Sequence, residues 1–475
     1  MNKSSLLKVN SSLLKGNTWL KGLFGVEKEN IRVDRHGVIA QTPHPAIFGD
    51  KLNHSYITTD FSESQVEMIT PPLPSIAETL GFLETIHDIV SLELEDEYLW
   101  PQSIPPILPN EDQIPIAKYP KGGRKEAEYR EKLALKYGRK KQAISGIHFN
   151  ISLDETLLEM LYQNTSGAIS IEAFRDEVYL KITRQILRYR WLYVLIFGSS
   201  PIVDPTYELK CCDLPLYFNA RTRGLSLRNS CFGYGNLIDL YPDYRTVKGY
   251  LQSIEQMVKN GSLTATKELY ASVRPKFINN SDSISYVEVR FPDINPLSKI
   301  GITPEMLHFI HWLIIYGLHT DEQNDFTTEF QSIADSNHGT ISLFGLNNNV
   351  EVKTEGGSSV NAWDEAKRVI QEMIDLYAKL EIDNKDYLNS LKYVQEMVNH
   401  PERRIVHQIL KETDVKGFIP FISKRRKTIY GKANRIASIS KGWKIWSFRR
   451  NCCFAKLFAG VLHLISSTEA RISFA

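Results

Sequence analysis

Acidic side chains stand inside segments whose pattern otherwise predicts β-strands. Residues 65–70 alternate polar and apolar side chains and end at two prolines, which predicts a strand, yet Glu67 lies at its centre. Upstream, the segment 25–33 also predicts a strand, and its Glu27 and Glu29 share one face because they are two residues apart. Carboxylates are depleted in strands and costly to bury alone. Each therefore needs a partner, which can be a metal ion, a basic residue or a set of backbone donors.

Two further predicted strands, 147–152 and 286–290, place apolar residues on one face and polar residues on the other. The polar positions are His148, Asn150, Ser152, Tyr286, Glu288 and Arg290. A buried salt bridge explains any one such strand equally well. Four strands with the same division favour a shared polar site on a sheet with an apolar back. Asp60, just before the strand of Glu67, adds another carboxylate.

The types of side chain narrow the chemistry of such a site. Several carboxylates with one histidine favour a hard divalent cation, Mg²⁺ or Mn²⁺. No phosphate-binding loop of the pattern G-x-x-x-x-G-K-[ST] occurs in the chain. Phosphate can still be held by metal ions that bridge carboxylates and phosphate oxygens, with arginines balancing the charge. Arg228, Arg274 and Arg290 are candidates, although a lone arginine is as often an ordinary surface residue.

Helices and loops are predicted between these strands. Apolar residues recur at helical spacing from Ser75 to Trp100, and Ser75 with Glu78 fits a capping box at the start. Residues 101–120 hold six prolines and predict an irregular loop. We expect further helices at residues 121–142, 171–197, 250–259, 304–316 and, as a polar outer layer, 361–412.

The composition is that of an ordinary soluble globular protein. The 475 residues are 42% hydrophobic and 24% charged, and the net charge of +2 gives no reason to expect a nucleic-acid partner. No signal peptide is evident, and the longest apolar run, 191–203, is too short to span a bilayer. The five cysteines form neither a zinc pattern nor a disulfide framework, so we expect a cytoplasmic protein.

An ordered set of short motifs adds a resemblance that covers about residues 20–300. The motifs are Gly25-Val-Glu-Lys-Glu-Asn-Ile-Arg32, Thr58-Thr-Asp-Phe-Ser-Glu63, Glu67-Met-Ile-Thr-Pro71, Ser145-Gly-Ile-His-Phe-Asn150, Ser226-Leu-Arg-Asn-Ser230, Gly233-Tyr234 and Tyr286-Val-Glu-Val-Arg290 with Asp293-Ile-Asn-Pro296. Each motif is weak alone, but the ordered set is specific. The chain resembles bacterial-type glutamate–cysteine ligases (γ-glutamylcysteine synthetases), and looks closest to the ligase half of bifunctional glutathione-synthesising enzymes.

The resemblance implies an α+β, glutamine-synthetase-like fold, in which a curved antiparallel sheet forms a funnel and helices pack outside. It implies that ATP phosphorylates the γ-carboxylate of glutamate and that the amine of cysteine then displaces the phosphate. The partners would be glutamate, cysteine and ATP with Mg²⁺ or Mn²⁺, and neither nucleic acid nor membrane. The oligomeric state stays open.

The resemblance also assigns roles to residues. The expected metal ligands are Glu27, Glu29, Asp60, Glu67, His148 and Glu288. Arg290 would neutralise the transferring phosphoryl group, and we count it with Glu27 as catalytic. The substrate-side residues would be Arg228 and Tyr234, with Tyr129 and Arg130 matching less securely. We expect ATP contacts from Asn150, Ser152, Arg274, Lys276 and Arg290. Cys231 departs from the polar residue expected after Leu-Arg-Asn-Ser.

The end of the chain differs in composition from the rest. Residues 421–475 hold 12 Lys and Arg against one acid, Glu469. We expect residues 1–420 to form the catalytic domain, and the tail to be a truncated or out-of-frame end without a second, ATP-grasp domain. A basic helix that docks on an acidic face is the alternative for this tail.

Two other functions also stay open for the protein, namely a ligase for another amine and an inactive remnant that binds nucleotide.

Overall fold

The computed structural model describes residues 14–424, apart from residues 121, 165–168, 209–222, 279–280, 323 and 423. The strands are β1 (Gly22–Val33), β2 (Ile57–Thr59), β3 (Gln65–Ile69), β4 (Tyr98–Leu99), β5 (Ile147–Leu153), β6 (Val273–Lys276), β7 (Tyr286–Val289), β8 (Glu351–Lys353) and β9 (Ser359–Asn361). The α-helices are α1 (Ile76–Glu93), α2 (Arg124–Tyr137), α3 (Arg139–Gln142), α4 (Glu155–Gln163), α5 (Ile171–Phe197), α6 (Val247–Lys259), α7 (Pro304–His319), α8 (Thr328–Phe344), α9 (Ala362–Lys379), α10 (Lys385–Asn399) and α11 (Ile405–Lys416).

A seven-stranded sheet forms the centre of the molecule. Its strands run in the order β2-β3-β1-β5-β7-β6, with β4 pairing the end of β1, and the paired strands are antiparallel. Direct cross-strand neighbours point to the same side of a sheet. The register therefore puts the predicted polar residues on one face, through the pairs Glu27–His148, Glu29–Glu67, Asn150–Glu288 and Arg274–Glu288.

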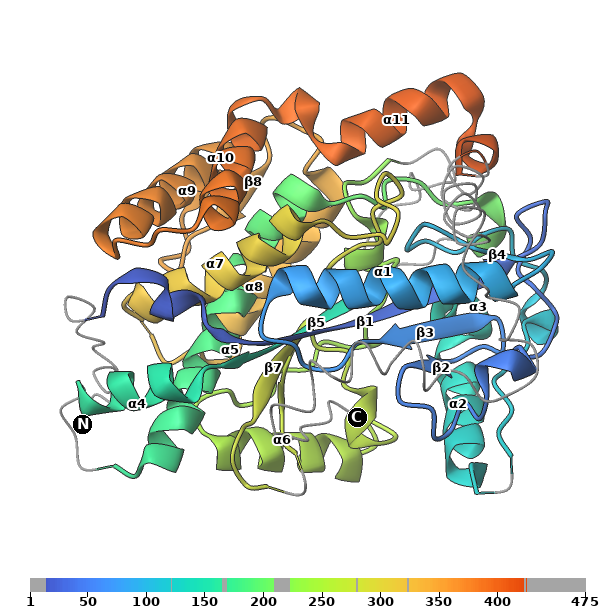
Figure 1. The fold of residues 1–475 in the computed structure, drawn as a ribbon, viewed down its shortest axis with the longest axis horizontal. Coiled ribbons are helices and arrows are strands. Elements are labelled where there is room, and N and C mark those ends of the chain that lie inside the picture. The colour runs from blue at the N-terminus through green and yellow to red at the C-terminus, as the bar shows by residue number, and fades with distance from the viewer. Residues whose placement is uncertain are drawn as a thin grey trace, which may run out of the picture.

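The opposite face of the sheet is covered by helices. Figure 1 shows α1 running along β1 and β3, with α7 on the same side, while α2 and α6 lie on the other side. Val66, Met68 and Phe149 are fully buried on this back face. The expectation of an apolar back is wrong in β1, where Lys28 and Asn30 are buried as well. Burial lowers the pKa of Lys28 to about 7.

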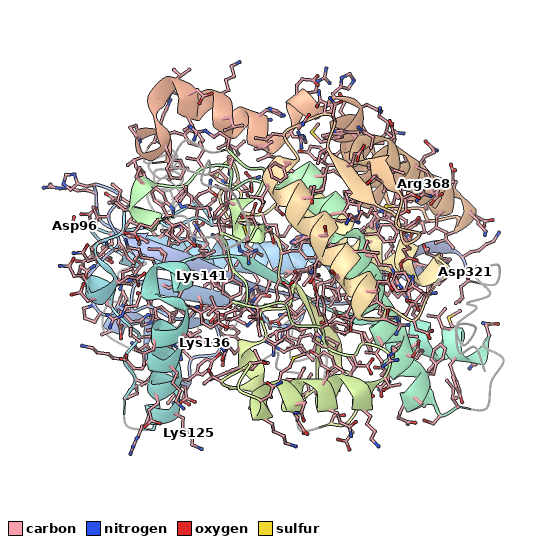
Figure 2. All side chains as sticks on the ribbon, turned by 180° about the vertical axis from the view of Figure 1, so that it is seen from behind. Asp96, Lys125, Lys136, Lys141, Asp321 and Arg368 are labelled. Carbon is pink, nitrogen blue, oxygen red and sulfur yellow. The ribbon has the colours of Figure 1, made fainter. Side chains whose placement is uncertain are left out.

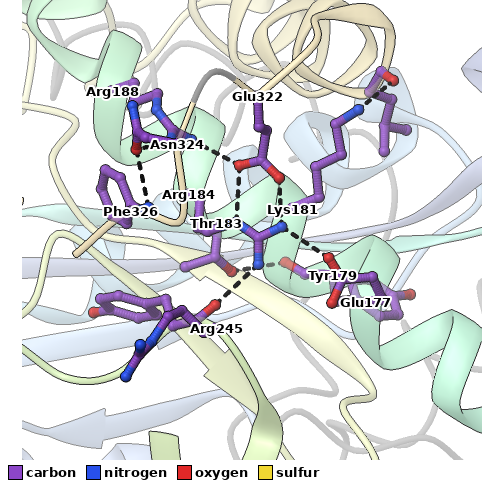
Figure 3. A network of polar contacts seen from close by, with 12 residues as sticks. Glu177, Tyr179, Lys181, Thr183, Arg184, Arg188, Arg245, Glu322, Asn324 and Phe326 are labelled. Carbon is purple, nitrogen blue, oxygen red and sulfur yellow. Dashed lines mark hydrogen bonds and ion pairs between the residues drawn. The ribbon is translucent and has the colours of Figure 1, made fainter. Parts of the chain in front are cut away.

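Helix α5 is the longest helix of the described residues and packs against α7, α8 and β6. The sequence predicted its bounds correctly but not the burial of its charged side chains. Arg184 donates hydrogen bonds to Glu177, Glu322 and the carbonyl of Tyr244 (Figure 3). Arg188 also pairs with Glu322, so two helix arginines share one carboxylate. This network fixes α5 to the segment that follows α7.

Two predicted helices end or break earlier than expected. The helix predicted for residues 75–100 ends at Glu93, because the chain turns through Glu95 at φ 43° and returns as β4 beside the end of β1. The Ser75 side chain caps its start by accepting a bond from Glu78 N–H, which is one of the two bonds of the predicted capping box. The helix predicted for residues 121–142 is divided into α2 and α3 at Gly138, whose φ of 82° favours glycine.

The outer helical layer predicted for residues 361–412 is confirmed as α9, α10 and α11, beside the small β8–β9 sheet. Seen from behind, Lys136 of α2 and Arg368 of α9 lie on opposite sides of the molecule (Figure 2).

One hydrophobic cluster extends from Leu14 to Ile422. Among the described residues, we find no helix long and apolar enough to cross a membrane. The tail from residue 425 onward lies outside the described residues.

Candidate active site

A carboxylate–histidine cluster occupies the polar face where β1, β5 and β7 lie side by side. Glu27, His148 and Glu288 each offer a ligand atom, and these atoms lie within 4.8 Å of one another. His148 Nδ1 is 3.1 Å from Glu27 Oε2 and 3.8 Å from Glu288 Oε1. Asn150 Nδ2 donates to Glu27 Oε1 at 2.8 Å. Two carboxylates and an imidazole at this spacing fit a hard divalent cation.

A second acidic group lies beside this cluster on β1 and β3. Burial raises the pKa of Glu67 well above its ordinary value, and the charges of Glu27, Asp60 and Glu29 raise it further. Burial and the charge of Asp60 likewise raise the pKa of Glu29 to about 8. These carboxylates repel one another without a cation between them. The only group of ligand atoms close enough to share a metal ion among the described residues is nevertheless Glu27, His148 and Glu288, so the structure does not bring Glu29, Asp60 and Glu67 into that group.

Cationic side chains surround Glu288 on the other side of the cluster. Arg290 Nη1 donates to Glu288 Oε2 at 3.1 Å, and Lys276 Nζ donates to Glu288 Oε1 at 3.4 Å. Although burial opposes ionisation, the charges of Arg290, Lys276 and His148 hold the pKa of Glu288 well below its ordinary value. Glu288 is thus a carboxylate that stays ionised, whereas Glu67 resists ionisation. The polar face therefore has an acidic part around Glu29 and Glu67, and a second part where cationic side chains balance the charge of Glu288.

Arg290 joins the cluster to a group of aromatic side chains. Its Nη2 donates to the hydroxyl of Tyr234 at 3.2 Å, and the ring of Tyr234 lies 4.4 Å from that of Tyr270. The Tyr270 hydroxyl donates to Gln142 Oε1 at 3.3 Å. The sequence reasoning missed Tyr270 and Gln142, since neither lies in a polar-faced strand or in a quoted motif. These rings form one wall beside Arg290.

Helix α2 contributes the next part of the wall. Arg130 donates to the carbonyls of Asp60 and Thr59, and so ties α2 to the loop that carries Asp60. Tyr129 lies in a small hydrophobic cluster with Phe61 and Tyr270, and burial raises its pKa. Arg130 therefore supports the position of Asp60 through backbone contacts, while Tyr129 extends the aromatic wall.

The remaining predicted residues are placed less centrally. Arg274 lies opposite Glu288 on β6, and Lys276 lies two residues further on the same face. Ser152 shares the face of His148 and Asn150 but lies near the end of β5, opposite Leu23. The structure thus groups Asn150, Arg274 and Lys276 with the cluster and leaves Ser152 at its margin.

Several buried nitrogen atoms on this face have no hydrogen-bond partner within the described residues. They are Nε of Arg228, Nε of Arg274, Nε of Arg290 and Nε2 of His148. Buried polar atoms are rarely left without partners unless a ligand, ion or water completes them. Three arginines with unsatisfied N–H groups around a carboxylate cluster favour anionic ligands that reach the site together with a cation.

Comparison with known proteins decides which family this site belongs to. The family model described as "Glutamate-cysteine ligase" matches residues 9–263 and 260–341. The chain belongs to the glutamate–cysteine ligase family. The resemblance seen in the sequence motifs is therefore confirmed, and the match includes the segments that supply every cluster residue named above.

Among relatives of the glutamate–cysteine ligase family, the "Glutathione biosynthesis bifunctional protein GshAB" of Desulfotalea psychrophila is 40% identical over 403 residues. The "Glutamate--cysteine ligase" of Clostridium acetobutylicum is 34% identical over 457 residues. The first alignment covers 84% of this chain and 52% of the relative, and the second covers 84% and 94%. The chain thus spans about half the length of the bifunctional relatives it matches.

Two solved structures of similar proteins share the fold. The Francisella tularensis enzyme, crystallised in complex with AMP, superposes with a TM-score of 0.80 at 25% identity, covering 87% of this chain and 89% of that one. A bifunctional glutathione synthetase from Pasteurella multocida gives 0.76 at 27% identity, covering 88% and 53%. The α+β fold with an antiparallel sheet and outer helices is thus confirmed, and the sheet is open rather than closed.

The departure at Cys231 has a structural counterpart in this member of the ligase family. Cys231 is exposed, follows the short 3-10 helix Leu227–Asn229, and is disulfide-bonded. The cysteine pattern, from which we expected no disulfide framework, did not indicate this bond.

Proposed function

We propose that this protein joins the γ-carboxylate of L-glutamate to the amine of L-cysteine at the expense of ATP, giving γ-glutamylcysteine, ADP and phosphate. The observation that carries this proposal is the polar face of the sheet, where the Glu27–His148–Glu288 cluster lies directly beside Arg290. Membership of the glutamate–cysteine ligase family supports the reaction type. The AMP complex of the Francisella tularensis enzyme supports a nucleotide as one ligand.

The acidic residues would hold Mg²⁺ or Mn²⁺ as two neighbouring groups. One group is Glu27, His148 and Glu288, and the other is Glu29, Asp60 and Glu67. Bound cations would screen the negative charge on ATP and glutamate, which otherwise repel each other. The protein supplies the fixed geometry, since five of the six side chains project from paired strands, and Asp60 is held by Arg130.

Arg290 would neutralise charge on the phosphoryl group in transit from ATP. Its guanidinium is largely buried and bonded to Glu288 on one side and Tyr234 on the other, so it is held in a fixed position. Lys276 and Arg274, on the edge strand β6, would contact the nucleotide phosphates. Asn150 contributes by orienting Glu27.

Arg228 and Tyr234 would face the amino-acid substrates. Phosphorylation of the γ-carboxylate forms an acyl phosphate and releases ADP. The amine then attacks the acyl carbon, the C–O bond to phosphate breaks, and the amine loses a proton as the amide forms. Arg228 carries a buried positive charge beside Glu29 and suits a substrate carboxylate.

The proposal is tested by ADP release from ATP with glutamate, Mg²⁺ and a panel of amines. We expect release that requires glutamate and cysteine together, with γ-glutamylcysteine as the product identified by mass spectrometry. ADP release with another amine alone would assign a related ligase. Nucleotide binding without turnover under all conditions would show an inactive protein and would overturn the proposal.

We further predict the order of amine use in this assay. Cysteine should have the highest kcat/KM, and 2-aminobutyrate, which lacks the thiol, should be used more weakly. The reason is membership of the glutamate–cysteine ligase family. Equal use of a large amine such as phenylalanine would contradict this order.

A further inference from the structure

Gly146 lies against the guanidinium of Arg228. A Cβ atom added at Gly146 would come within 1.9 Å of Arg228 Nη2, 2.4 Å of its Cζ and 2.6 Å of its Nε. The three nearest atoms thus all belong to one guanidinium group. Gly146 is not among the glycines with positive φ, so its backbone conformation does not require glycine. Glycine is therefore needed at this position only because Arg228 occupies the space that a side chain would take.

The same residue holds a carboxylate of the acidic group. Gly146 N–H donates to Glu29 Oε2 at 2.9 Å, and the Gly146 carbonyl accepts from Glu29 N–H at 3.1 Å. Gly146 therefore contacts Glu29 through its backbone N–H and carbonyl groups, and Arg228 packs against its Cα, which carries no side chain. Electrostatics agree with this geometry, because the charge of Arg228 opposes the rise in the pKa of Glu29.

Arg228 has little freedom to move elsewhere. It is 3% exposed, its Nη2 donates to the Arg290 carbonyl at 2.7 Å, and its own carbonyl accepts from Tyr234 N–H at 2.9 Å. A Cβ at Gly233 would come within 1.8 Å of the Arg228 carbonyl oxygen, so the chain packs tightly there too. A methyl group at Gly146 must therefore displace the guanidinium from its place beside Glu29.

We propose that Gly146 is a positioning residue for glutamate binding, because it lets the Arg228 guanidinium lie directly on the peptide that fixes Glu29. Arg228 and the acidic group of Glu29, Asp60 and Glu67 are thereby held at a fixed distance from each other. One end of glutamate would then contact Arg228 while the other end reaches the cations. This inference rests on the proposed function, since it needs Arg228 to contact glutamate. Gly146 itself contacts neither substrate nor cation.

The kinetic test compares Gly146→Ala with Gly339→Ala. Gly339 lies in α8, is half-buried and has no atom within 4 Å of an added Cβ, so it is a matched control. We expect Gly146→Ala to raise the KM for glutamate about tenfold or more, and to leave the KM for ATP within about twofold. The control should match the wild type in both. An unchanged KM for glutamate in an active, folded Gly146→Ala enzyme would overturn the inference.

A double-mutant cycle that measures the Tm tests the inference without any measurement of turnover. Gly146→Ala should lower the Tm of the wild type, but it should leave the Tm of Arg228→Ala unchanged, because the truncated side chain frees the space. Equal losses of Tm in the two backgrounds would overturn the inference, even if Gly146→Ala proves inactive. If the wild type shows no turnover with glutamate, the proposed function fails, and the double-mutant cycle still decides whether Gly146 makes room for Arg228.

Discussion

Glu67 and Glu288 lie on the same face of the sheet in opposite electrostatic surroundings. Glu67 is surrounded by other carboxylates, whereas Glu288 is paired with Arg290 and Lys276. Removing the charge at each position should therefore have the same effect on catalysis and different effects on stability. The difference in stability reports the surroundings of each carboxylate when no cation is bound.

We predict that Glu67→Gln and Glu288→Gln each lower the rate of ADP release by several orders of magnitude, since each removes a charge from the cation site. In metal-free buffer, Glu67→Gln should keep the Tm because Glu67 already resists ionisation there, and Glu288→Gln should lower the Tm because two ion pairs are lost. Exposed Glu84→Gln serves as the control for both measurements. Near-normal turnover of either variant with Mg²⁺ would refute the ligand assignment.

We predict that Arg290→Lys is not a conservative change. Lysine keeps the charge but cannot bond Glu288 and Tyr234 at once while presenting further N–H groups to a phosphoryl group. The kcat should fall far more than the KM for ATP rises, because the interaction strengthens in the transition state. Steady-state kinetics with varied ATP provide the measurement. A change confined to KM would show that Arg290 binds only ground-state phosphate.

The polar face could be predicted residue by residue because strand alternation is a local property. Glu27, His148 and Glu288 were placed together from alternation and motif order, and the register confirms that they share a face. Tyr270 and Gly146 could not be predicted in the same way. Their roles depend on which side chain packs against them, and the local pattern contains no information about a neighbour about a hundred residues away.

Helix α7 shows how packing between elements sets the protonation of buried groups. His311 on α7 is fully buried, with its Nδ1 2.6 Å from the Tyr387 hydroxyl of α10. Burial, with a smaller contribution from His308, lowers the pKa of His311 to about 3. The sequence predicted an apolar helix here but could not indicate that a histidine would be held neutral at its centre.

We predict that His311 makes the fold acid-sensitive. An unfolded histidine titrates near 6.5, so below this pH the unfolded state binds a proton that the folded state refuses, and stability falls as the pH drops from 6.5 toward 3. The Tm of His311→Gln should therefore fall less than that of the wild type between pH 7 and about 5. His36→Gln, at an exposed position, should keep the wild-type slope.

The main hydrophobic cluster of the described residues includes side chains from Leu14 to Ile422, so the first two residues of the basic tail belong to the core. We propose that the later part of the tail, residues 443–475, is dispensable for the catalytic domain. Deletion of residues 443–475 should leave the ligase rate and the Tm unchanged, as measured by ADP release and thermal unfolding. A deletion that unfolds the protein, or lowers its Tm by several degrees, would show that the tail belongs to the fold.

The strand order of the central sheet also sets when the protein can first bind its ligands during synthesis. Strands β1 and β3 are made early and pair with each other, yet β5, the other neighbour of β1, follows only at residues 147–153, and β7, which pairs β5, follows at residues 286–289. At a translation speed of about 5–20 residues per second, roughly ten seconds or more separate Glu27 from Glu288. Until then the acidic strands β1 and β3 lack the remaining strands of the sheet. We therefore expect the ribosome or chaperones to protect these segments during synthesis. We also expect refolding in vitro to be slow, as for other sheets built from strands that are distant in sequence.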